Sequence, residues 1–181
     1  MLGEAWPVIV PCPQAETGCC GFQSRETGKS EVARELSRLL GMRVFDIDRE
    51  IETSQQKSIA EIFSCYGEDY FRQIEAAAIL QFASEQGVII STGGGAVLRE
   101  ENLKALQAHG LIFCLTASPE TIMLRTAGNN DRPLLQCDNR QMRISELLAE
   151  RQPYYEKAGI LINTEGKTPF EIANEIIGKI S

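Results

Sequence analysis

The chain has 181 residues, of which 43% are hydrophobic and 24% charged, and its formal net charge at pH 7 is −7. This length suits one α/β domain with its own core, and the composition is typical of a globular protein. The acidic balance offers no basic face to a nucleic-acid backbone, and no stretch approaches the roughly 20 apolar residues of a membrane span. We therefore expect one domain over residues 1–181, without nucleic-acid or membrane partners. The six cysteines form no C-x-x-C pair, which favours reduced thiols in a cytoplasmic protein, and we expect a monomer.

Helix-like and strand-like segments alternate from residue 29 onward. Apolar residues recur at helical spacing in some segments and form short continuous runs in others. The start and stop signals agree with this pattern, because Gly41 stands at a helix C-cap position and Ser58 with Glu61 forms a capping box. The expected elements, in chain order, are helix 30–40, strand 43–45, helix 58–66, helix 68–86, strand 88–90, helix 99–108, strand 111–115, helix 118–126, helix 142–157, strand 160–162 and a C-terminal helix opened by a second capping box at 168–171.

Strands that are separated by helices pair in parallel and carry helices on both faces of the sheet. We therefore predict an α/β fold, a three-layer α/β/α domain with a central parallel five-stranded sheet. Ligands of such sheets bind at the carboxyl ends of the strands. The segments expected along that edge are Gly28 to Ser30, Asp46, Asp48, Gly93 to Gly95 and the residues after Leu115.

Residues 1–27 form an atypical N-terminal segment. Its main apolar run, residues 6–13, contains three prolines, at positions 7, 11 and 13, and these argue against a central strand. The alternative strand, around Cys19 to Phe22, is short. The position of the first strand therefore stays open at this stage.

The string Gly28-Lys29-Ser30 matches the second half of a phosphate-binding loop of the form G-x-x-x-x-G-K-[ST]. Amides at a helix start bind anions, Lys29 supplies a charge for the outer phosphates, and the Ser30 hydroxyl can ligate Mg²⁺. The first glycine of the motif would stand at residue 23, where the chain has Gln23. Glu26 adds a negative charge beside the expected phosphates, so we expect weakened or absent ATP binding unless the loop rearranges.

Two carboxylates, Asp46 and Asp48, follow the expected strand 43–45. A single carboxylate at this place is more often a helix cap, but the pair favours a functional role. One of them can hold a metal-bound water while the other reaches a different partner. Residues 128–140 are polar and rich in helix breakers, which is typical of a mobile lid, and Arg132 within them has no packing role there.

Several strings of this chain together resemble the shikimate kinase family. The resemblance covers residues 28–181 and is specific in its triple glycine and its arginines. The strings that carry it are Phe45-Asp46-Ile47-Asp48-Arg49-Glu50-Ile51-Glu52, Ser58-Ile59-Ala60-Glu61-Ile62-Phe63, Gly67-Glu68-x-x-Phe71-Arg72-x-x-Glu75, Ser91-Thr92-Gly93-Gly94-Gly95-Ala96-Val97, Arg125, Arg132-Pro133-Leu134-Leu135 and Glu150-Arg151-x-x-Tyr154-Tyr155.

The resemblance implies a P-loop kinase fold with a lid and transfer of the ATP γ-phosphoryl group to the 3-hydroxyl of shikimate. It implies ATP and Mg²⁺ as the small molecules beside shikimate. The implied catalytic residues are Lys29, Asp48 and Arg132. The implied nucleotide contacts are Gly28, Lys29, Ser30, Arg125, which would stack on adenine, and Arg132. The implied metal ligands are Ser30 and Asp46. The implied shikimate contacts are Asp48, Arg72, Gly93, Gly94, Gly95 and Arg151, with Arg72 and Arg151 clamping the carboxylate.

Alternatives stay open beside this hypothesis. Arg72 and Arg151 could be solvated charges on helix surfaces. The chain could be a non-catalytic relative that binds shikimate or a partner but not ATP, because of the altered loop before Gly28. It could also phosphorylate another small hydroxyl substrate such as gluconate, although a clamp of two arginines with a triple glycine favours a ring carboxylate.

Overall fold

This computed structural model describes residues 5–10, 29–126 and 140–180, so the phosphate loop before Lys29 and most of the expected lid lie outside the described residues. The elements, in chain order, are β1 (Ala5–Val10), α1 (Lys29–Leu40), β2 (Arg43–Asp46), α2 (Ile47–Gln55), α3 (Ile59–Ala83), β3 (Val88–Ser91), the 3-10 helix η1 (Ala96–Leu98), α4 (Glu100–His109), β4 (Leu111–Thr116), α5 (Pro119–Thr126), α6 (Arg140–Ala158), β5 (Ile160–Asn163) and α7 (Pro169–Ile180).

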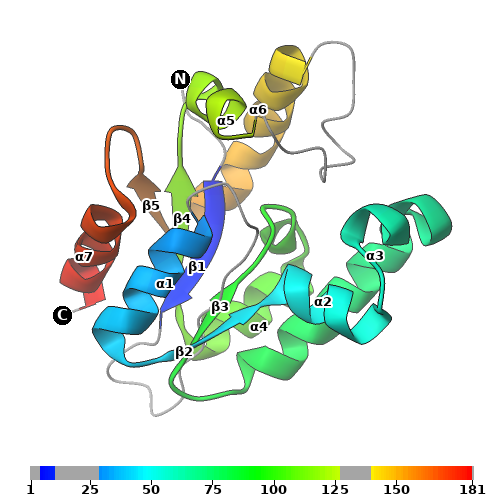
Figure 1. Ribbon diagram of the computed structural model, residues 1–181, viewed down its shortest axis with the longest axis horizontal. Coiled ribbons are helices and arrows are strands. Elements are labelled where there is room, and N and C mark those ends of the chain that lie inside the picture. Colours follow the sequence, from blue (N-terminus) through cyan, green and yellow to red (C-terminus); the bar gives the residue numbers. More distant parts are fainter. Residues whose placement is uncertain (1–4, 11–28, 127–139, 181) are drawn as a thin grey trace.

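Five strands form one sheet in the order β2-β3-β1-β4-β5, with β1 in its centre (Figure 1). The pairs β2 with β3 and β4 with β5 are parallel. Strand β1 is antiparallel to both of its neighbours, so the expected all-parallel sheet is wrong at this strand. Because β3 and β4 both run opposite to β1, the other four strands share one direction. Their carboxyl ends therefore lie along one edge, as the binding-site argument requires.

The central place of β1 answers the question that the sequence left open, although the prolines of this segment argued against a central strand. Pro7 lies opposite Cys114 of β4, whereas the pairing with β3 includes only Val8 and Ile9. Pro7 therefore lies outside the pairing with β3. A proline is tolerated in a strand where its nitrogen need not donate a hydrogen bond. The apolar run of residues 8–10 has the β-branched character that central strands favour. The alternative strand around Cys19 to Phe22 lies outside the described residues.

The core lies on both faces of the sheet. In Figure 1, α1 and α7 lie side by side on the near face, and α4 lies behind β3. Val88, Ile89 and Ile90 of β3 are fully buried, which confirms the prediction of a strand covered on both sides. The fully buried Leu36 of α1 and Leu106 of α4 belong to the same hydrophobic core. This packing fixes the helices that carry the polar residues of the edge.

Most helix ends follow the sequence signals. Gly41 adopts a left-handed φ of 68° after α1, and its amide donates to the Ser37 carbonyl over 2.8 Å. The Ser58 and Glu61 side chains form the predicted capping box at the start of α3. The two helices expected on either side of Gly67 are one span of 25 residues, broken at Gly67 by its φ of 80°. The helix α2 is absent from the predicted elements, because the residues after Asp46 show a carboxylate motif and not a clear helical pattern.

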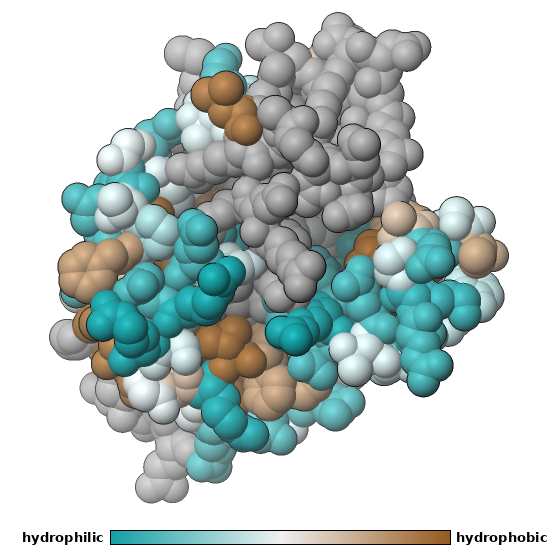
Figure 2. All heavy atoms as spheres, viewed as in Figure 1, coloured by the Kyte–Doolittle hydropathy of each residue, from teal (hydrophilic) through white to brown (hydrophobic). Residues whose placement is uncertain are grey.

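The surface seen in Figure 2 shows apolar side chains as separate spots among hydrophilic ones. Exposed apolar side chains come from distant elements, such as Leu80 on α3, Leu124 on α5 and Phe170 on α7. Within residues 5–10, 29–126 and 140–180, no helix has the length and apolar character needed to cross a membrane.

Candidate active site

Lys29 and Ser30 begin α1 and are almost completely buried, with exposed fractions of 2% and 3%. A helix start presents amides and the positive end of the helix dipole, which together attract an anion. The ammonium of Lys29 lies close enough to lower the pKa of Asp46 by its charge. The first turn of α1 therefore meets the end of β2. Gly28, the preceding member of the motif, lies outside the described residues.

Asp46 ends β2 and caps α2. Its Oδ1 accepts a hydrogen bond from the Arg49 amide over 3.0 Å, so the alternative role of helix cap is real. Its Oδ2 is buried and has no hydrogen-bond partner among the described residues. Burial, with a further contribution from the Asp48 charge, raises the pKa of Asp46 to about 8, although the Arg49 amide and Lys29 act in the opposite direction. A buried carboxylate oxygen that lacks a donor fits a cation.

Magnesium ions usually keep several waters and use only one or two protein carboxylates together with substrate phosphates. Among the described residues there is no group of three or more His, Cys, Asp or Glu side chains that could form an all-protein metal site. The orphaned Oδ2 of Asp46 and the nearby start of α1 with Ser30 match the smaller set of ligands. The residues present therefore fit a magnesium ion that is held jointly by protein and nucleotide.

Asp48 and Glu75 face the triple glycine. A Cβ atom built on Gly93 would lie 3.6 Å from Glu75 Oε1 and 3.8 Å from Asp48 Oδ1. The charge of Asp48 contributes to raising the pKa of Glu75, so the two carboxyl groups also interact with each other. This arrangement brings together α2, α3 and the turn after β3, as the sequence predicted for Asp48 and Gly93.

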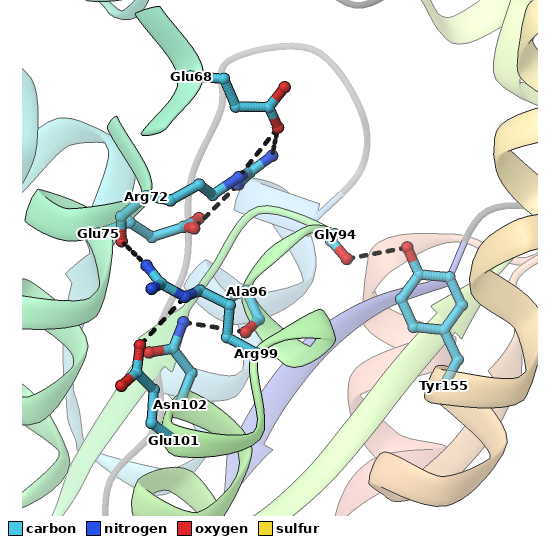
Figure 3. A network of polar contacts seen from close by, with 9 residues as sticks. All are labelled: Glu68, Arg72, Glu75, Gly94, Ala96, Arg99, Glu101, Asn102 and Tyr155. Atoms are coloured by element: carbon cyan, nitrogen blue, oxygen red, sulfur yellow. Dashed lines mark hydrogen bonds and ion pairs between the residues drawn. The ribbon is translucent and has the colours of Figure 1, made fainter. Parts of the chain in front are cut away.

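Arg72 of α3 is held by two carboxylates (Figure 3). Its Nη1 donates to Glu75 Oε2 over 2.9 Å, and its Nη2 and Nε donate to Glu68 Oε1 over 2.9 and 3.2 Å. Its side chain is only 17% exposed, so the solvated-charge alternative is wrong for Arg72. The hydrogen bonds to Glu68 and Glu75 fix the direction of the guanidinium, and recognition of a planar carboxylate requires such a fixed direction.

Glu75 is a further functional candidate, to which the sequence motifs assign no role. Its side chain is fully buried, and burial raises its pKa to about 7, although Arg72 and Arg99 lower it. Its Oε1 has no hydrogen-bond partner among the described residues. The signal was available, since residues three apart on a helix are neighbours and opposite charges there form pairs.

The triple glycine forms a tight turn before η1. The Gly93 carbonyl accepts from the Ala96 amide over 3.1 Å, and the Gly95 carbonyl accepts from the Leu98 amide over 3.2 Å. A Cβ atom built on Gly95 would lie only 2.6 Å from Arg72 Nη1. A side chain at position 95 would therefore displace the guanidinium that packs against it, a reason for glycine that the sequence did not reveal.

The remaining predicted site residues are less closely defined. Arg151 lies on α6 and is half-buried. Arg125 lies in the last turn of α5, and its side chain is outside the described part of the structure. Arg132 and the rest of the expected lid up to residue 139 are likewise outside it, whereas Arg140 begins α6.

Arg99 also joins this site, although the sequence argument did not single it out. Its Nη1 donates to the backbone carbonyl of Arg72 over 2.8 Å (Figure 3). Its Nε lies 3.0 Å from Glu101 Oε1. Arg99 thus connects the residue after η1 to the middle of α3.

The lysine and serine at the start of α1, the carboxylate of Asp46 at the end of β2 and that of Asp48 just after it define a class. This is the class of P-loop kinases, α/β enzymes that transfer a phosphoryl group. The family model described as shikimate kinase matches residues 25–181. A shikimate kinase of Thermodesulfovibrio yellowstonii is 46% identical over 151 residues, which are 83% of this chain and 87% of that protein.

Further relatives agree. A shikimate kinase of Thermus thermophilus is 39% identical over 172 residues, covering 94% of this chain and 92% of that protein. The solved structure of a shikimate kinase from Acinetobacter baumannii in complex with shikimate has a TM-score of 0.81 at 30% identity and covers 90% of each chain. That of a shikimate kinase from Aquifex aeolicus has a TM-score of 0.72 at 33% identity, covering 90% of this chain and 93% of the other. The chain belongs to the shikimate kinase family.

Proposed function

We propose that the chain is an ATP-dependent kinase that phosphorylates the 3-hydroxyl of shikimate. The observation that carries the proposal is that Asp48 and Arg72 both lie close to the glycine turn, at the edge of the sheet where α1 begins. Family membership and the relatives named as shikimate kinases support it. The arrangement suits a small polar ring with a carboxylate, because it offers one fixed guanidinium beside Gly95 and one carboxylate beside Gly93.

The acceptor is held by its carboxylate and its hydroxyl. Arg72 and Arg151 bind the carboxylate, and Glu68 and Glu75 keep the Arg72 guanidinium in place for this contact. Asp48 accepts a hydrogen bond from the 3-hydroxyl and takes its proton as the oxygen attacks the γ-phosphorus. The new bond joins that oxygen to phosphorus, the bond to the β-phosphate oxygen breaks, and ADP leaves.

The donor is held at the start of α1. The amides there and the ammonium of Lys29 contact the phosphates, and Arg132 neutralises charge on the transferring group. Arg125 stacks on the adenine. Ser30 and Asp46 would hold a magnesium ion, which would supply charge neutralisation at the phosphate oxygens.

A coupled assay of ADP release, with and without shikimate, tests the proposal. We expect release that depends on shikimate, and a loss of at least about 100-fold in Lys29→Ala, because electrostatic groups at the transferring phosphoryl are worth several kcal/mol. Lys104→Ala is the matched control, since Lys104 is 72% exposed on α4 and pairs only with its helix neighbour Glu100 in the interactions described. Turnover that is indifferent to shikimate or to Lys29→Ala would refute the proposal.

One observation favours a second candidate, a non-catalytic relative. The family match begins at residue 25, and Gln23 stands where the first glycine of the phosphate loop belongs. Calorimetric titration separates the two candidates. Shikimate binding without ATP binding supports the non-catalytic protein, whereas ATP binding removes it. Gluconate in place of shikimate in the same ADP assay tests the other acceptor.

A further inference from the structure

Tyr155 lies on α6 and reaches the middle of the triple glycine. Its side chain is 2% exposed, and its hydroxyl donates a hydrogen bond to the Gly94 carbonyl over 3.0 Å (Figure 3). The two residues are 61 positions apart in the sequence. A buried tyrosine needs a partner for its hydroxyl, but here the partner is the backbone of the predicted shikimate site.

The other carbonyls of this turn are satisfied from within it or from the next helix. Those of Gly93 and Gly95 accept amides of η1, and that of Ala96 accepts Asn102 Nδ2 over 3.0 Å. The Gly94 carbonyl differs, because the hydroxyl that donates to it belongs to Tyr155, on a helix much later in the chain. This hydrogen bond therefore ties the glycine turn to α6.

The other side of the turn is held by α3. The guanidinium of Arg72 occupies the space where a side chain at Gly95 would stand. Arg99 adds a second connection, from the end of η1 to the Arg72 carbonyl. The glycine turn thus lies between two helices, with Arg72 on α3 and Tyr155 on α6.

Both helices carry a proposed carboxylate ligand. Arg151 precedes Tyr155 by four residues on α6, and residues at this spacing lie on the same face of a helix, one turn apart. A shift of α6 relative to the turn would therefore move Arg151 relative to Arg72. A planar carboxylate that is held by two guanidinium groups is sensitive to such a shift, since bidentate contacts tolerate little displacement.

We infer that the Tyr155 hydroxyl is a positioning group for shikimate, which fixes α6 to the Gly94 carbonyl and so sets the distance between Arg151 and Arg72. The inference rests on the proposed function and adds to it how the residues that bind shikimate are positioned. Tyr155 does not touch the reacting atoms. It acts through the backbone of the turn and through Arg151.

Tyr155→Phe removes the hydroxyl and keeps the buried ring, so the fold is retained. We expect the KM for shikimate to rise about 5- to 20-fold. The Gly94 carbonyl would lose its hydrogen-bond donor, and Arg151 would be held less firmly relative to Arg72. The KM for ATP and kcat should stay within about threefold. Tyr154→Phe is the matched control, because the neighbouring Tyr154 is 48% exposed, and it should leave all three constants unchanged.

The methyl ester of shikimate separates positioning from a general loosening of the site. The ester has no carboxylate anion, so Tyr155→Phe should leave its KM within about twofold of that of the wild-type protein. An equal rise in KM for shikimate, its ester and ATP would show a merely structural role and overturn the inference. Unchanged KM for shikimate in Tyr155→Phe would also overturn it.

Calorimetric binding of shikimate to the same three proteins keeps this test apart from the test of the proposed function. If the wild-type chain binds shikimate but releases no ADP, the proposed kinase activity fails, and the change of shikimate Kd in Tyr155→Phe still decides the inference. If the wild-type chain does not bind shikimate, both fail.

Discussion

Replacing Gly95 with alanine tests whether the site is built around the Arg72 guanidinium. Gly95 has φ −80° and ψ −16°, a conformation that any residue adopts, so the backbone itself accepts alanine. The obstacle is the side chain of Arg72, whose Nη1, Cζ and Nη2 would lie 2.6, 2.8 and 2.8 Å from the new methyl group. Any effect of the substitution therefore reports on Arg72.

The size of the effect follows from how Arg72 is held. Non-bonded atoms pack at about 3.5 Å, so the guanidinium must move by about 1 Å. Three hydrogen bonds to Glu68 and Glu75 oppose this movement, and Glu75 is fully buried. Weakening a buried charge-assisted hydrogen bond costs about 1.5 to 3 kcal/mol, which corresponds to about 10- to 100-fold in the KM for shikimate.

The assay is shikimate-dependent ADP release, together with urea unfolding. Gly178→Ala is the control, because Gly178 lies inside α7 with open space around its Cβ position and should gain about 1 kcal/mol of stability from its better helix propensity. A Gly95→Ala protein whose KM for shikimate stays within twofold of that of the wild-type chain would refute the assignment of this space to Arg72.

Two further predictions concern stability. Gly159→Ala should lower the free energy of unfolding by about 3 kcal/mol in urea titrations. The new methyl group would overlap the backbone carbonyl of Ile112, which cannot rotate away as a side chain can. A loss as small as that at an exposed site would contradict this packing. Burial raises the pKa of Glu75 from 4.5 to about 7, so between these values the native chain keeps a proton that the unfolded chain has released. Raising the pH through this window should therefore lower the free energy of unfolding by up to about 3 kcal/mol. Glu75→Gln has no titrating carboxyl group at this position, so its unfolding free energy should fall less over the same pH range. An identical dependence on pH in both proteins would count against the burial of an unpaired carboxyl oxygen.

Part of the candidate site could be predicted from sequence because its residues follow strand ends. Asp48 and Gly93 were expected at one edge, and the structure brings them together, since a Cβ atom built on Gly93 would lie 3.8 Å from Asp48 Oδ1. The direction of Arg72 could not be predicted to the same degree. Its partners Glu68 and Glu75 lie within one helical turn, but whether they are buried depends on what covers α3.

The first strand shows a different failure. Pro7 argued against a central position on local grounds, and β1 nevertheless lies between β3 and β4. Tertiary pairing overrode this local preference, because β1 pairs with both neighbouring strands and its pairing with β3 includes Val8 and Ile9 but not Pro7.

The sequence by itself determined the ends of helices and the buried strands. Gly41, the Ser58 capping box and the break at Gly67 act on backbone groups within four or five residues, and such short-range chemistry is the same in any fold. Only the tertiary structure decided the direction of β1, the packing of the Arg72 guanidinium against Gly95, and the hydrogen bond from Tyr155 to Gly94. These features join residues that are far apart in the chain, and their energies exist only once the elements have packed against one another.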